Sequence, residues 1–173
     1  MKKSLYKLLT ITLLLLSLFL IIGIYIGLNL NFSYTYTDDK INGFSGVFTF
    51  FFHNIVFILI NILGIFCFGI PSILILIWNG ILFGISIGFS YHNGMSILEI
   101  ILRLSHGIFE IPSLLISASI GMLGFYFYSS KNKKQLLILS IKLSFLSIIL
   151  LFLASIFEAN ITDYLVELYI SIR

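Results

Sequence analysis

Residues 8–28, LLTITLLLLSLFLIIGIYIGL, decide the fold of this chain. They form an apolar run without a charged residue, and a helix of about 20 such residues crosses a bilayer core roughly 30 Å thick. Lys2, Lys3 and Lys7 precede the run, as lysines do in a secretory signal. The run is longer than a signal requires, and no small-x-small cleavage site follows it. We therefore expect an uncleaved first membrane span.

The composition extends this prediction to the whole chain. Hydrophobic residues make up 60% of the 173 residues and charged residues only 10%, whereas a soluble domain has about 25% charged residues. Further apolar runs cover residues 46–68, 73–89, 108–128 and 136–157, and they do not alternate as barrel strands do. A helix forms all of its backbone hydrogen bonds within itself, as a segment in lipid must. We predict one all-α integral membrane domain, residues 1–173, with five spans and short interfacial helices.

Two segments mix polar and apolar residues. Residues 95–104 place Ser96, Glu99 and Arg103 among apolar residues, and the tail after residue 157 has similar character. These patterns fit helices lying in the membrane interface. Short helices packed on the bundle fit them equally well.

Lysine and arginine predict the orientation, because cytoplasmic loops carry an excess of them. The amino terminus has three lysines, and residues 131–134 have three more. Residues 29–45 carry a net charge of −1 and residues 158–173 a net charge of −2. With five spans, the basic segments fall on one side and the acidic segments on the other. We expect a multi-pass protein of the plasma membrane with its amino terminus cytoplasmic and its carboxyl terminus outside.

Small residues recur at four-residue spacing in two predicted spans. The third carries Gly80, Gly84 and Gly88, and the fourth carries Ser113, Ser117 and Gly121. Each set lies on one helix face, and small residues let helices approach closely in membranes. We expect the third and fourth spans to pack tightly together. The alternative is a face for self-association into a homo-oligomer.

Amide side chains also lie within the predicted spans. Asn54 and Asn61 are seven residues apart on the second, and Asn79 lies in the third. Buried amides in membranes usually hydrogen-bond to neighbouring helices. That interpretation competes with a polar pathway across the bundle.

Glu110 is the most informative residue. A charged carboxylate at the centre of a span costs about 3 kcal/mol, so it needs a partner or a proton. Glu99, Arg103, His106 and Glu110 would form one stripe on a continuous helix, although Pro112 indicates a break nearby. We interpret this polar group, with Glu158 at the end of the fifth span, as a folding contact or a partner-docking element. A proton relay or ion site is the alternative.

Enzymatic and metal-dependent functions find little support. His53, His92 and His106 are scattered, and no H-E-x-x-H or other ligand spacing occurs. Cys67 is the only cysteine, which excludes an intrachain disulfide. The net charge of +3 comes from basic residues at the ends of apolar runs, which indicates membrane orientation and not nucleic-acid binding. We expect no catalysis, no metal and no cofactor; an intramembrane hydrolase would need a nucleophile–base pair that we do not find.

Residues 106–112, His-Gly-Ile-Phe-Glu-Ile-Pro, followed by 117–121, Ser-Ala-Ser-Ile-Gly, resemble the signature of the stage II sporulation protein M family. Weaker matches follow the family pattern in order at residues 51–54, 69–71, 78–84 and 154–162. The resemblance covers about residues 48–162.

The resemblance implies a multi-pass membrane protein. In spore-forming bacteria the name-giving member resides in the septal and engulfing membrane and assembles with cell-wall-degrading proteins. Relatives occur in non-sporulating bacteria and archaea, some in gene clusters for circular bacteriocins, where they are linked to secretion or self-immunity. Membrane or envelope partners, such as cell-wall hydrolases or transporter subunits, are therefore implied in addition to lipid.

Two functional hypotheses remain. The first is a non-catalytic scaffold or accessory subunit of a membrane or cell-envelope complex, in which Arg103, His106 and Glu110 dock a partner. The second is a transport or export component, for example in peptide secretion or self-immunity, with Asn54, Asn61, Asn79 and Glu110 lining a pathway.

Overall fold

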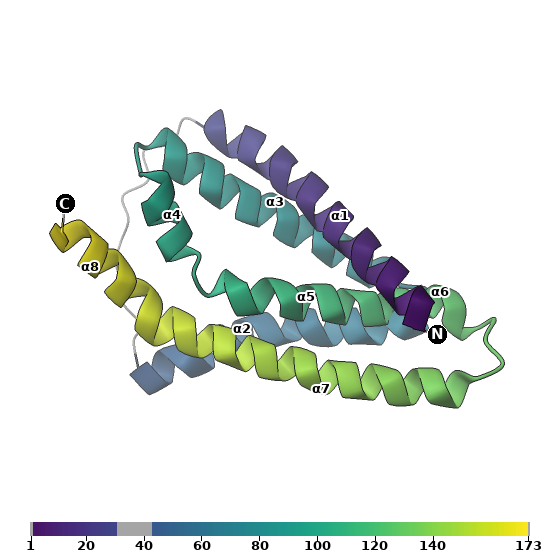
Figure 1. Ribbon diagram of the computed structural model, residues 1–173. Coiled ribbons are helices and arrows are strands. Elements are labelled where there is room, and N and C mark those ends of the chain that lie inside the picture. Colours follow the sequence, from purple (N-terminus) through teal and green to yellow (C-terminus); the bar gives the residue numbers. More distant parts are fainter. Residues whose placement is uncertain (1, 31–42, 173) are drawn as a thin grey trace.

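The computed structural model describes residues 2–30 and 43–172, and every regular element in these stretches is a helix (Figure 1). In chain order the elements are α1 (Lys2–Leu28), α2 (Gly43–Leu63), a 3₁₀ turn (Gly64–Phe66), α3 (Ile70–His92), α4 (Ile97–Arg103), α5 (Gly107–Met122), α6 (Gly124–Phe127), α7 (Lys133–Phe157), a π-helical turn (Glu158–Thr162) and α8 (Asp163–Ile172).

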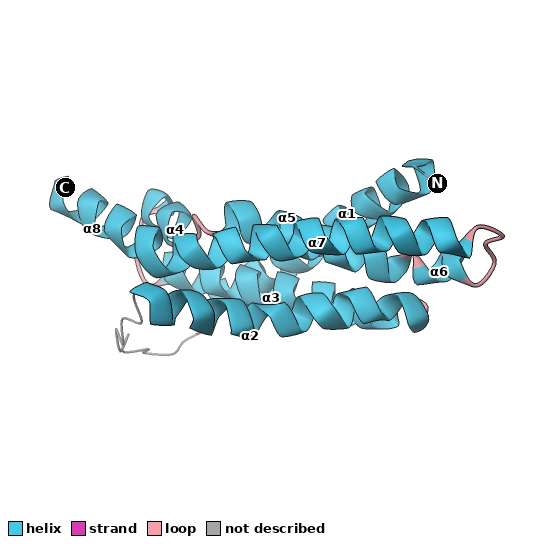
Figure 2. Ribbon diagram, turned by 90° about the horizontal axis from the view of Figure 1, so that it is seen from below, coloured by secondary structure: helices cyan, strands magenta, loops and turns pink. Residues whose placement is uncertain are grey.

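Five helical segments are long and apolar enough to cross a membrane, which confirms the predicted five-span helical bundle. They cover Leu5–Leu28, Gly43–Phe66, Ile70–His92, Gly107–Phe127 and Lys133–Ile172. The two ends of the described chain lie at opposite ends of the bundle in both views (Figures 1 and 2), as an odd number of spans requires. We call these the amino-terminal end and the α4 end.

All five spans begin before their predicted boundaries, and the third and fifth also end after them. The third begins at Ile70, because Gly69 adopts φ +72° and Pro71 sits in the first helical turn, where the missing N–H costs nothing. The fifth does not stop at residue 157 but continues through the π-helical turn into α8. The predicted tail helix is therefore an extension of the fifth span.

The spans form two arms that join at the amino-terminal end and separate toward the α4 end (Figure 1). One arm is the pair α1 and α3; the other comprises α2, α5 and α7. The arms meet in an apolar cluster contributed by α1, the 3₁₀ turn, the end of α5 and α7: Leu8, Ile65, Met122, Leu123 and Leu136. Nearer the middle, Leu16 of α1 and Leu76 of α3 pack on Leu114 and Ala118 of α5.

The glycine stripe of α3 packs against α1, so the predicted pairing of the third and fourth spans is wrong. A Cβ added to Gly84 would lie 2.7 Å from Cα of Gly23, and one added to Gly27 would lie 2.8 Å from the backbone nitrogen of Phe89. The helix backbones are thus in direct contact. Gly23 and Gly27 of α1 are the glycines that complement the stripe.

Helix α5 carries the serines and glycine that were expected to face α3, and they contact three different helices. Ser113 Oγ donates to the carbonyl oxygen of Ser147 in α7 at 2.7 Å, and Ser147 Oγ donates back to that of Ser113 at 2.8 Å. Ser117 Oγ accepts from Nδ2 of Asn61 in α2 at 3.1 Å. Gly121 lies against Ser72 of α3. These residues make α5 the central helix of the bundle.

The mixed segment before α5 forms α4, which packs against α3 and α8. Both flanking turns are tied to the end of the fifth span. Ser96 Oγ lies 3.1 Å from Tyr169 Oη, and Ser105 Oγ lies 3.1 Å from Thr162 Oγ1. This mixed segment thus forms a short helix packed on the bundle, whereas the tail continues the fifth span.

The α1–α3 contact predicts a strong effect of Gly84→Ala. The new Cβ would meet Cα of Gly23 and the backbone nitrogen of Ile24, both at 2.7 Å, so the helices must move apart. We expect the free energy of unfolding to fall by about 1–3 kcal/mol, measured by thermal unfolding in detergent. Gly107→Ala is the control, because its Cβ would meet only Ile111 Cδ1 at 3.7 Å. Equal destabilisation by both variants would contradict the packing argument.

Candidate functional site

A cavity of about 850 Å³ lies where the two arms have separated. Its walls come from α2, α3, α4, the start of α5 and the π-helical turn. The lining residues that carry polar side chains are Thr49, His53, Asn54, Trp78, Asn79, Ser86, Ser90, Arg103, His106, Glu110 and Glu158. An apolar set completes the walls: Phe50, Phe57, Leu82, Phe83, Ile100 and Leu104.

Six of the seven polar residues singled out in the sequence line this cavity: Asn54, Asn79, Arg103, His106, Glu110 and Glu158. The seventh, Asn61, lies elsewhere. It sits two helical turns further along α2, toward the amino-terminal end, and is fully buried. Its Nδ2 donates to Ser117, and its backbone carbonyl accepts from Ser72 Oγ at 3.1 Å. Asn61 thus joins α2 to α5 and α3.

The two glutamates of the cavity come from different spans. Glu110 lies in the first turn of α5, and Glu158 begins the π-helical turn. Both side chains line the same cavity. The π-helical turn is itself informative, because single π turns inside α-helices occur frequently at functional sites. Two like-charged groups held together in a cavity favour binding of a positive group or a proton between them.

His106 stands at the junction of α4 and α5 and faces Glu110. Its Nε2 lies 3.4 Å from Glu110 Oε2. Burial lowers the pKa of the His106 imidazole, which favours the neutral ring. In the neutral ring one nitrogen donates and the other accepts. Nε2 lies toward the Glu110 carboxyl group, while Nδ1 has no hydrogen-bond partner among the described residues.

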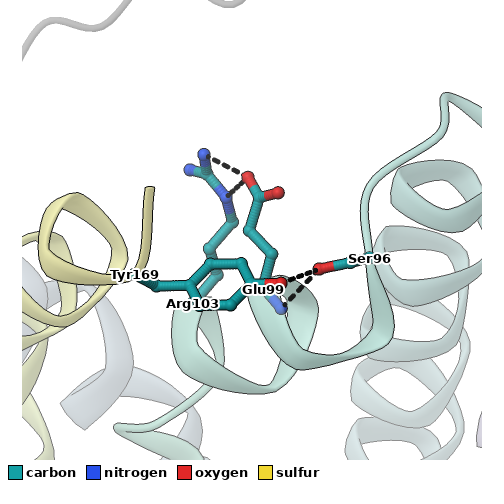
Figure 3. Close-up of polar contacts among 4 residues, drawn as sticks. All are labelled: Ser96, Glu99, Arg103 and Tyr169. Carbon is teal, nitrogen blue, oxygen red and sulfur yellow. Dashed lines mark hydrogen bonds and ion pairs between the residues drawn. The ribbon is translucent and has the colours of Figure 1, made fainter. Parts of the chain in front are cut away.

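Helix α4 lines one side of the cavity. Polar contacts of its own residues stabilise the helix (Figure 3). Ser96 caps the helix by accepting a hydrogen bond from the backbone N–H of Glu99 at 3.2 Å. Arg103 Nη2 pairs with Glu99 Oε1 at 3.1 Å. The predicted continuous stripe is therefore divided at the turn before Gly107. It forms two separate pairs, Glu99 with Arg103 and His106 with Glu110.

Sequence reasoning missed several lining residues, among them His53, Trp78, Ser86 and Ser90. A signal for two of them was present. Ser86 and Ser90 follow Asn79 by seven and eleven residues, which places all three on one helix face. That face adjoins the glycine stripe, so α3 presents its glycines to α1 and its polar residues to the cavity.

The cavity combines aromatic walls with a small number of charged groups. Such sites bind amphipathic groups, with the polar side chains fixing orientation. Within residues 2–30 and 43–172, no cluster of three or more His, Cys, Asp or Glu residues could hold a metal ion. Cys67 is exposed and lies at the opposite end of α2 from the cavity.

Comparison with known proteins identifies the family. The family model "Stage II sporulation protein M" matches residues 10–163, which is most of the chain. The protein therefore belongs to this family, as its sequence signature predicts. No curated protein and no solved structure matches the chain.

The cavity predicts that water reaches the middle of α2 on one face only. Asn54 lines the cavity, whereas Val56, two residues on, is exposed on the outside of the bundle. With Cys67 replaced by serine, we expect a water-soluble thiol reagent to modify Asn54→Cys much faster than Val56→Cys, because the reactive thiolate forms where water reaches the sulfur. Equal rates in detergent-free membranes would contradict a water-accessible cavity.

Proposed function

We propose that this protein is a non-catalytic accessory subunit that holds a partner protein at the polar cavity. One observation carries the proposal. Five elements bring Asn54, Asn79, Arg103, Glu110 and Glu158 to one cavity of the helical bundle. Polar groups inside a membrane are costly and mark functional sites by default. Their convergence on one space, without a metal-binding cluster among the described residues, fits docking better than catalysis.

The charges of the cavity specify the chemistry of the partner. Arg103 already pairs with Glu99, and Glu110 Oε2 lies 3.4 Å from His106 Nε2. The carboxyl groups of Glu110 and Glu158 line the cavity and can pair with a positive group that enters it. The aromatic walls accept an apolar chain. A membrane segment that carries a lysine or arginine would match both properties, since a charge in lipid is retained where it is paired.

The distribution of basic residues supports a location in the plasma membrane with the amino terminus in the cytoplasm. The cavity then opens in the outer half of the membrane. Partners at that surface include the cell-wall hydrolases and transporter subunits that the family resemblance suggests, and we propose a membrane or envelope protein of this kind.

Replacing both glutamates should weaken partner binding. Glutamine preserves the size of the side chains, so Glu110→Gln with Glu158→Gln removes the negative charge while keeping the packing. We expect recovery of co-purifying proteins from native membranes in mild detergent to fall at least about tenfold, because losing one charged partner of a buried pair costs about 2–5 kcal/mol. Quantitative mass spectrometry of the purified complex measures this.

Asp163→Asn is the matched control, since Asp163 is an acidic residue at the same end of the fifth span that does not line the cavity. It should leave recovery unchanged. A double variant that recovers the same partners in the same amounts as the parent protein would end the docking proposal.

The single native cysteine tests the orientation. Cys67 is exposed at the amino-terminal end of the bundle, so a membrane-impermeant maleimide should label it only after cells are permeabilised. In a Cys67→Ser background, Asn93→Cys at the α4 end should react in intact cells. Labelling of Cys67 in intact cells, with protection of residue 93, would establish the opposite orientation.

A transport role is the second candidate, and the surroundings of Asn61 favour it. Buried hydroxyl groups continue from Asn61 toward the amino-terminal end: Ser72 and Ser117 contact it, and Thr12 Oγ1 lies 3.2 Å from Ser119 Oγ. Asn61 Oδ1 has no partner among the described residues. Flux of protons, ions or peptide in reconstituted vesicles that Asn61→Leu abolishes would replace docking with transport. Vesicles impermeable under every gradient would remove this candidate.

A further inference from the structure

A second hollow lies at the amino-terminal end of the bundle, far from the polar cavity. It has a volume of about 400 Å³ and forms where α6 turns into α7. Leu123, Tyr126 and Leu136 make its apolar surface, and Ser129, Ser130, Asn132 and Gln135 supply polar groups. It therefore combines hydrogen-bond donors with an apolar wall at the point where two membrane spans end.

Lysines lie next to the lining residues of this hollow in the sequence. Lys131, Lys133 and Lys134 are exposed. In the sequence they lie between the lining residues Ser130 and Gln135, on either side of Asn132. Lys133 Nζ lies 5.8 Å from the centre of the Phe127 ring, which places one ammonium group across the turn from α7 to α6. Lys7 of α1 is exposed at the same end of the bundle.

No described carboxylate balances these lysines locally. The described acidic residues belong to α4, the start of α5, the π-helical turn and α8, all at the α4 end. Helix α7 alone separates Lys133 from Glu158 by 25 residues, or roughly 37 Å at 1.5 Å per residue. This is several Debye lengths at physiological salt, so the lysines are left to attract other anions.

We propose that this hollow binds the headgroup of an anionic phospholipid. Serine hydroxyls and the amides of Asn132 and Gln135 can donate to phosphate oxygens, while the lysines supply the opposite charge. Basic pockets between membrane helices bind anionic headgroups in this manner. The apolar wall of Leu123 and Leu136 accommodates the glycerol and the first carbons of the acyl chains, which favours a lipid over free phosphate. The site is independent of the proposed docking function.

Binding can be measured on the full chain in detergent by native mass spectrometry, with phosphatidylglycerol and phosphatidylcholine as probes. We expect the parent protein to retain phosphatidylglycerol preferentially. Substituting Lys131, Lys133 and Lys134 by glutamine should weaken that retention at least about tenfold, because each lysine near an anionic headgroup contributes measurably to binding. Lys142→Gln is the control, since Lys142 is an exposed lysine further along the same helix and should leave retention unchanged.

A second variant tests the hollow itself. Asn132→Ala with Gln135→Ala keeps every lysine but removes two donors, and the Asn132 side chain does not cap α7, so the helix should remain intact. Weaker retention of phosphatidylglycerol supports the site. Unchanged retention, an equal loss in Lys142→Gln, or an absence of lipid preference in the parent protein would overturn it. Displacement of the lipid by millimolar inorganic phosphate would reassign the hollow to free phosphate.

Discussion

The direct contact between the backbones of α1 and α3 is the constraint on which the rest of the structure depends. Lipid offers helices little hydrophobic reason to associate, so close packing and interhelical hydrogen bonds must hold them together. Gly23 of α1 and Gly84 of α3 bring the helix axes so near that a single methyl group would force them apart. The pair therefore behaves as one arm, and it remains joined where it separates from the other arm toward the α4 end.

The second arm is organised by hydrogen bonds in place of glycine contacts. Ser113 and Ser147 exchange hydrogen bonds between α5 and α7, and Asn61 connects α2 to Ser117 of α5. These groups are buried, and within this set Asn61 Oδ1 lacks a partner among the described residues. The polar residues of the cavity differ, because they lie where the arms no longer touch. A bundle that separates at one end can keep Glu110 and Glu158 in its interior without burying them completely.

The number of spans and the helical class could be predicted from the sequence, because the length of an apolar run and the need to satisfy the backbone in lipid leave few alternatives. The polar residues of the cavity were also recognisable, since Glu110 and Asn79 stand out in apolar surroundings. Their convergence was not, because it depends on the separation of the arms. The stripe at Gly80, Gly84 and Gly88 did not identify its partner helix. Four-residue spacing shows only that small residues share one helix face. The complementary face of α1 has just two glycines, Gly23 and Gly27, which do not stand out in a leucine-rich run.

The two ends of the molecule pose opposite electrostatic problems, and this asymmetry connects the cavity to the hollow. At the α4 end, acidic groups lie in a cavity whose own cation, Arg103, is already paired with Glu99. At the amino-terminal end, lysines flank the residues of a small hollow in sequence, without a described carboxylate nearby. Among the described residues, neither end can be neutralised by the other across the length of a span. We propose a lipid headgroup as the counter-charge at one surface and a partner protein at the other.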